Sequence, residues 1–165
     1  MAWGAPDAAE DVAAGAAERW SLGVPLELDV VGLAIGVHPE ALYRPFDPEG
    51  GFHLRAAAGT MFGPELTLIS PLALGVRQEF FPRKRVQPGL GTGFQWQTFA
   101  VYGDGAHNRI DMYMEMSLHV RVQDDFDVGL QISPEFGLVG MGKDGFYSTF
   151  GLGMATRLNV QWNGF

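Results

Sequence analysis

The chain has 165 residues, a net charge of −8 and no cysteine, so it suits one domain and has no disulfide, thiolate metal site or cysteine nucleophile. The acidic balance argues against a nucleic-acid partner, because phosphate binding needs clustered Lys and Arg. No stretch approaches the roughly 18 consecutive apolar residues of a membrane helix, so a helical membrane protein is excluded.

Residues 1–20 form a polar, alanine-rich N-terminal segment that we predict to be a short helix or disordered. The segment lacks the basic region and the apolar region of a secretory signal. If the protein is exported, we expect its signal peptide to be absent from this chain.

Residues 21–165 are predicted to form a β-domain, since 23 glycines and ten prolines suit many strands joined by turns. Residues 21–37 alternate at first and then become apolar on both parities, which indicates a bulge near Val31. Residues 38–50 contain three prolines and predict a long loop, within which A-L-Y-R-P-F allows a short strand. Six clear alternating segments follow, separated by turn signals: residues 52–62, 66–80, 90–102, 109–123, 126–138 and 146–162.

The clearest of these segments is R-I-D-M-Y-M-E-M-S-L-H-V-R-V-Q, residues 109–123, in which every second side chain is apolar. A period of two indicates a β-strand with two chemically opposite faces. Seven clear strands and a candidate eighth predict an all-β fold, a single antiparallel up-and-down β-barrel of about eight strands. An apolar interior would make it a soluble carrier, whereas an apolar exterior would make it a transmembrane barrel.

The polar face mixes glycine and alanine with charges of both signs, which suits a crowded interior better than a solvated surface. Lysine, expected on a soluble exterior, occurs only at positions 84 and 143. Charged side chains in so narrow a lumen must pair with each other. The predicted lumen network comprises Arg55, Arg77, Glu79, Asp111, Glu115, His119, Arg121, Glu135 and Arg157.

The apolar face is almost uncharged between residues 52 and 162 and carries aromatic residues toward the segment ends, as a lipid-facing band requires. The predicted lipid-facing residues include Met112, Met114, Met116, Leu118, Val128, Leu130, Leu152 and Leu158. The alternative is a soluble lipocalin-like carrier, in which the same residues would line an apolar cavity for an apolar ligand.

This pattern of alternating strands, short turns, polar interior and the C-terminal N-V-Q-W-N-G-F resembles the small bacterial outer-membrane β-barrels of the OmpA transmembrane-domain and OmpX type. The resemblance is one of architecture and not of motif. It implies a location in the outer membrane of Gram-negative bacteria and recognition by the barrel-assembly machinery. In that family the last strand commonly ends on Phe, whereas Phe165 departs from the parity of Leu158, Val160 and Trp162.

Ser117, His119, Glu115 and Glu135 supply the residue types of a hydrolytic triad, and lipid A deacylases are outer-membrane barrels that use such residues. The family's His-x-Ser order is reversed here, however, and neighbours two apart on a strand lie about 6.5 to 7 Å apart. A paired polar interior explains the same residues without catalysis. The four histidines lack metal-ligand spacing, and we expect neither a metal nor a cofactor.

The run P-R-K-R-V contains the only basic cluster, Arg83, Lys84 and Arg85. It indicates either a solvated loop or a contact with lipid headgroup phosphates, possible sources being phospholipid and lipopolysaccharide. The sequence thus predicts an integral outer-membrane barrel with a polar, side-chain-filled lumen and a narrow pore or none, with a structural or surface-contact role. The soluble carrier and the membrane-embedded lipid hydrolase remain the alternatives.

Overall fold

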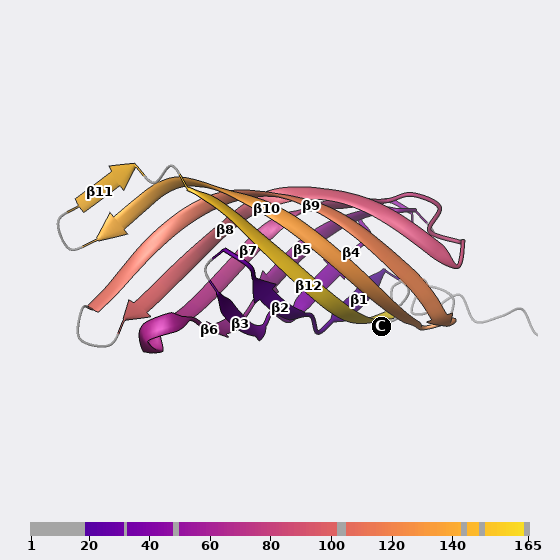
Figure 1. Cartoon of the computed structure of the whole chain (residues 1–165). Coiled ribbons are helices and arrows are strands. Elements are labelled where there is room, and N and C mark those ends of the chain that lie inside the picture. Colours follow the sequence, from indigo (N-terminus) through magenta and orange to yellow (C-terminus); the bar gives the residue numbers. More distant parts are fainter. Residues whose placement is uncertain are drawn as a thin grey trace, which may run out of the picture.

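The computed structural model describes residues 19–31, 33–47, 50–101, 105–142, 145–148 and 151–163. The predicted N-terminal segment lies outside the described residues, apart from Arg19 and Trp20. Figure 1 shows strands wound around a common axis. The strands are β1 (Trp20–Gly23), β2 (Leu26–Asp29), β3 (Ala34–Val37), β4 (Glu40–Tyr43), β5 (Phe52–Ala58), β6 (Thr60–Phe62), β7 (Leu68–Glu79), β8 (Val86–Val101), β9 (Gly105–Gln123), β10 (Phe126–Gly142), β11 (Gly145–Ser148) and β12 (Leu152–Asn163).

These twelve segments make eight barrel strands, because four strands are each divided into two segments. Segments β1 and β2 both pair with β12, β5 and β6 both pair with β7, and β11 and β12 both pair with β10. Segments β3 and β4 together lie between β1–β2 and β5–β6. Every pairing is antiparallel, and the last strand pairs with the first, so the described ladder closes. The prediction of eight strands is confirmed.

The register fixes how far the strands tilt. A line can be followed once around the barrel by stepping from each residue to its paired residue on the next strand. The line starts at Ser21 on β1 and reaches Gly153 on β12. Gly153 lies two residues before Ala155, which pairs with Asp29, so Gly153 lies opposite Val31. The line has then advanced ten residues, from position 21 to position 31, along the first strand. Such a stagger goes with strands tilted about 35–45° from the barrel axis. Figure 1 shows the strands running obliquely to one another around the barrel.

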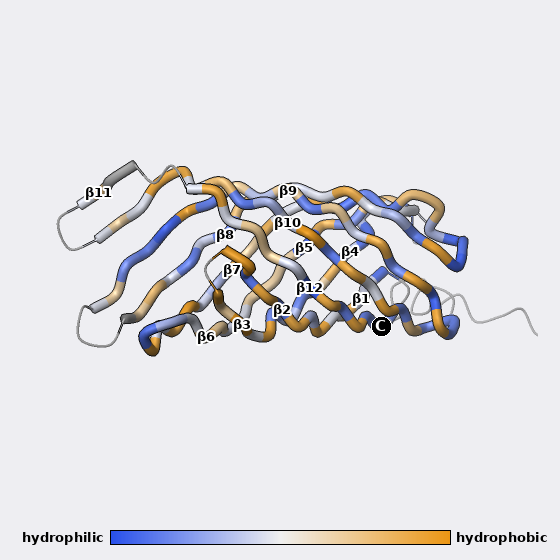
Figure 2. Tube along the Cα trace, in the orientation of Figure 1, coloured by the Kyte–Doolittle hydropathy of each residue, from blue (hydrophilic) through white to orange (hydrophobic). Residues whose placement is uncertain are grey.

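Charged side chains point inward along the strands, and most apolar side chains point outward. Leu42, Met61 and Ile69 are apolar exceptions that lie inside. Figure 2 shows this alternation as blue and orange steps along the trace. Every Asp, Glu, Arg and His of the described strands is buried or half-buried, while Leu72, Leu74 and Phe94 each expose more than half of their surface. The carrier alternative is therefore wrong, because it requires the apolar face to line the interior.

Three boundaries differ from those predicted. The chain reverses between β2 and β3, which pair antiparallel, and so does not bulge near Val31. Val31 N donates to Asp29 Oδ1 (3.0 Å), and Leu33 adopts a positive φ of 53°. The loop predicted over residues 38–50 contains strand β4. Pro39 directly precedes β4; it has no N–H to donate, but its carbonyl oxygen accepts from Ala58 N (3.1 Å). Likewise β8 begins at Val86, four residues before the predicted segment 90–102, and Pro88 O accepts from Phe80 N (2.7 Å).

Aromatic side chains gather at both ends of the barrel. At the end where β1 begins and β12 finishes, Trp20 packs on Tyr43 with ring centroids 4.8 Å apart, and Phe126 packs on Trp162 at 5.6 Å. Phe62 lies exposed toward the opposite end. The only helix described is the 3-10 turn Pro64–Leu66, and within the described residues no helix has the length and hydropathy to cross a membrane.

Candidate functional site

The interior of the barrel holds the predicted network residues. All lie on the inward parity, and Arg121 alone is half-buried. The fully buried members are Arg55, Arg77, Glu79, Asp111, Glu115, His119, Glu135 and Arg157. Their role stays a prediction, but their contacts follow from the geometry below.

Glu40 on β4 is the centre of the network. Arg55 Nε donates to its Oε2 (2.6 Å), and Arg77 Nη2 donates to the same oxygen (3.2 Å). Asn159 Nδ2 donates to Oε1 (2.6 Å), as does Gln131 Nε2 (3.3 Å). Donors from four other strands thus converge on one fully buried carboxylate, which ties opposite walls of the barrel together.

A second carboxylate completes the central group. Arg77 Nε donates to Glu115 Oε1 (2.7 Å), and Arg55 Nε lies 3.8 Å from Glu115 Oε2. Arg55 Nη1 also donates to Tyr113 Oη (3.0 Å). Two arginines and two glutamates therefore form an alternating, charge-balanced cluster, which is the arrangement that makes buried charges tolerable.

Glycines make room for this cluster. A Cβ at Gly75 or Gly93 would collide with Tyr113 Oη, and a Cβ at Gly129 would collide with the His119 ring. Large inward side chains on one strand thus lie over glycines on the neighbouring strands. This matches the small and charged mixture that the polar face shows in the sequence.

Arg157 organises the interior toward the opposite end from the termini. It holds Glu27 with two hydrogen bonds, from Nε (2.9 Å) and Nη2 (3.0 Å), and donates through Nη1 to Ser133 Oγ (2.8 Å). Its Nη2 also lies 3.5 Å from Glu135 Oε1. His38 Nδ1 lies 2.7 Å from Glu27 Oε2, so this carboxylate has partners on both sides.

Below the central group, toward the termini, Glu79 lies between two histidines. Its carboxylate is 3.8 Å from His53 Nε2 and 3.8 Å from His119 Nδ1. Arg44 Nε donates to His53 Nε2 (2.8 Å), and Gln131 Nε2 lies 3.5 Å from His119 Nε2. These contacts join the lower interior to the central group through Gln131.

Paired charges also lie near the two ends of the barrel. Arg109 donates to Asp111 (2.8 Å) and to Gln97 (3.1 Å) at one end. Arg121 Nε lies 3.4 Å from Asp127 at the other end, where Asn163 Nδ2 also donates to Asp127 (2.7 Å). Side-chain contacts therefore occupy the described interior along its length.

The contacts around Ser117 do not assemble a hydrolytic triad. Glu115 binds Arg77, Glu135 lies beside Arg157, and His119 faces Glu79, while no described group makes a hydrogen bond with Ser117 Oγ. A serine nucleophile needs a base within hydrogen-bond distance. We therefore expect Ser117→Ala to leave the lipid composition of producing cells unchanged, as measured by mass spectrometry of extracted lipids. A lipid product lost in this variant but retained in Ser133→Ala would contradict the expectation.

Glu27, His38 and Glu40 are the main interior residues that the sequence did not predict. His38 and Glu40 lie in residues 38–50, where prolines predicted a loop, and Glu27 lies in the alternating part of residues 21–37, before the stretch that is apolar on both parities. The available signal was E-A-L-Y, in which Glu40 and Leu42 share the inward parity. The described residues contain no group of three His, Asp or Glu side chains arranged to hold a metal ion.

The outer face carries the predicted lipid-facing residues. Met114, Met116, Leu118, Leu130, Leu152 and Leu158 are exposed, and Met112 and Val128 are partly exposed on the same face. Two polar side chains on this face bond to the backbone: Thr92 Oγ1 donates to Tyr113 O (2.9 Å) and Gln78 Nε2 donates to Glu79 O (2.8 Å).

The basic cluster Arg83, Lys84 and Arg85 lies exposed in the turn between β7 and β8, beside exposed Phe80 and Phe81. Lys84 N donates to Phe81 O (2.9 Å), and Arg121 Nη2 donates to Pro82 O (3.1 Å), so the turn is held by its own backbone and by β9.

Comparisons with known proteins agree on the fold. The chain is similar to the crystal structure of Neisserial surface protein A, with a TM-score of 0.58 and 12% identity over 88% of this chain and 94% of that one. It is also similar to the N-terminal β-barrel domain of Pseudomonas aeruginosa OprF, with a TM-score of 0.62 and 9% identity over 88% and 98%. No protein-family model and no curated protein matches the sequence. At these identities the likeness concerns the fold, and it confirms the architecture that the alternating strands predict.

Proposed function

We propose that this chain is an integral outer-membrane β-barrel protein of Gram-negative bacteria, folded there with the help of the barrel-assembly machinery. One observation carries the proposal: every charged strand residue that the structure describes faces inward, and the outward face is apolar. A closed barrel leaves no backbone hydrogen-bonding edge, which a strand needs in order to cross hydrocarbon. Aromatic residues at both ends add the interfacial girdles of such barrels.

We further propose that the interior is filled and that the barrel does not conduct large solutes. The support is a series of separate side-chain contacts at successive levels of the interior, around Arg109, Arg157, Glu40, Glu79 and Arg121. An eight-stranded barrel has an interior just wide enough for such packed side chains. The protein then has a structural role or acts through its ends.

Cell fractionation tests the location. With an export signal supplied in a Gram-negative host, we expect the chain to sediment with the outer membrane and to be released by detergent but not by salt or alkali. Recovery in the soluble periplasmic fraction, with the fold intact, would contradict the proposal.

The basic turn is proposed to contact lipid headgroup phosphates, with phospholipid and lipopolysaccharide as candidate sources. Replacing Arg83, Lys84 and Arg85 together by Gln should slow folding into vesicles rich in phosphatidylglycerol, since each basic side chain near an anionic surface contributes about 1 kcal/mol. We expect no such difference in phosphatidylcholine vesicles, and a smaller one at about 1 M salt, where screening is strong. An equal slowing in both vesicle types would show that the turn acts on folding and not on headgroups.

A further inference from the structure

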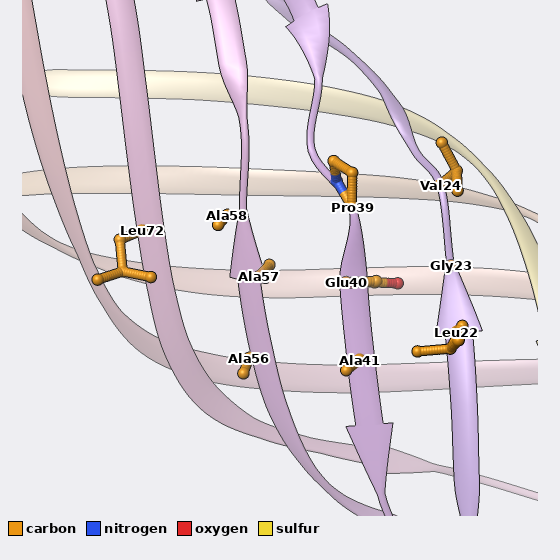
Figure 3. A pocket seen from close by; sticks show the side chains of 10 residues that line it. All are labelled: Leu22, Gly23, Val24, Pro39, Glu40, Ala41, Ala56, Ala57, Ala58 and Leu72. Carbon is orange, nitrogen blue, oxygen red and sulfur yellow. The ribbon is translucent and has the colours of Figure 1, made fainter. Parts of the chain in front are cut away.

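The outward face has a hollow over strands β1, β4, β5 and β7. Pro39, Ala41, Ala56 and Ala58 form a low floor, and the bulkier Leu22, Val24 and Leu72 stand on either side (Figure 3). We call this feature the alanine trough. Its volume is about 390 Å³. The lining also includes Gly23, Glu40 and Ala57, the inward-facing residues that alternate with the outward ones along these strands.

The register shows that the trough is an ordered groove. Leu22 pairs with Ala41, Ala41 with Ala56, and Ala56 with Leu74, so one row of neighbours has a large side chain at each end and alanine between. The next row repeats the arrangement, because Ala58 N bonds to Pro39 O and Ala58 pairs with Leu72. Two successive rows thus make a groove that runs along β4 and β5.

The position of the trough indicates what it fits. Trp20 and Tyr43 pair in the next row toward the chain termini, and their rings carry polar atoms that suit the headgroup region. Pro39 lies four residues from Tyr43, which is roughly 13 Å along the strand. Because the strands tilt, the distance along the membrane normal is somewhat smaller and stays within half of the ~30 Å hydrocarbon core. The trough therefore starts at an interface and ends near the bilayer centre, as one acyl chain does.

We propose that the alanine trough binds one acyl chain of a membrane phospholipid, with the headgroup beside Trp20 and Tyr43. This inference rests on the proposed membrane location. A second barrel fits less well, because a convex wall bearing Leu and Met side chains cannot reach a floor set between two bulky rows. A flexible chain one methylene wide can lie along the floor and contact both walls.

The test counts phospholipids that stay bound to the protein. Wild-type chain is folded into vesicles of phosphatidylethanolamine and phosphatidylglycerol, extracted into lipid-free mild detergent, and examined by native mass spectrometry. We expect about one retained phospholipid per barrel. Ala56→Phe fills the floor and should retain at least roughly tenfold less. Leu130→Phe adds the same ring to the outward face of β10 and should retain as much as wild type.

Ala41→Val, a smaller change that favours strand structure, provides a second filled variant if Ala56→Phe does not fold. Equal retention in the filled variants and in Leu130→Phe would overturn the proposal. A two-barrel species that disappears in the filled variants would also overturn it, in favour of a second copy of the chain. Failure of the wild-type chain to enter vesicles would instead refute the membrane location, and is distinguishable from entry without lipid retention.

Discussion

Glu40→Ala is expected to destabilise the barrel by about 3–5 kcal/mol, the largest effect of any single substitution that we predict. The variant removes the acceptor for Arg55, Arg77, Gln131 and Asn159 at once. Two guanidinium groups would then remain buried, and among the described residues Glu115 would be the only carboxylate within ion-pair distance of them. Urea-induced unfolding from vesicles, followed by tryptophan fluorescence, measures the change.

Two controls separate the network from the loss of one acidic residue. Glu65→Ala removes an exposed glutamate from the turn Pro64–Leu66 and should change stability by no more than about 0.5 kcal/mol. Glu40→Gln keeps an acceptor but not the charge and should fall between the two. If Glu40→Ala were no more destabilising than Glu65→Ala, the interior network would not be what holds the walls together.

Met116→Arg is expected to destabilise the barrel in vesicles by about 2–4 kcal/mol, the value for an arginine facing lipid near the bilayer midplane. Met116 is 54% exposed and lies at the centre of the outward series from Ile110 to Val122, between Leu90 and Ile132 on the neighbouring strands. Its new guanidinium would lie in hydrocarbon. The same urea titration measures the effect.

Val122→Arg is the matched control, because Val122 is also exposed but lies beside the turn at residues 124–125. Its guanidinium reaches the interface, so the change should be about 0–1 kcal/mol. Equal effects at both positions would indicate that the outer face of β9 does not cross a bilayer.

Which residues share a strand face could be predicted from sequence, because this depends only on the period of two. Glu115 and His119 alternate with Met114, Met116 and Leu118, and no other arrangement of a strand separates them. Small residues such as Gly75 and Gly93 on the polar parity also predicted a crowded interior, and the structure places Tyr113 over both.

The partners within the interior could not be predicted, because they depend on closure and on the stagger. Arg157 binds Glu27 from 130 positions away, a contact that exists only once the last strand pairs with the first. Glu40 lies in a segment whose prolines predicted a loop. Contacts that can be predicted from sequence are short-range pairs such as Arg121 with Asp127, which one hairpin brings together.

Contact between the apolar face of this barrel and lipid is tested by the behaviour of the purified, folded chain as detergent is removed, together with its migration on gels before and after heating. We expect the chain to aggregate without detergent or vesicles, and the unheated folded barrel to migrate differently from the heated chain. A folded chain that stays monodisperse in plain buffer would contradict this expectation.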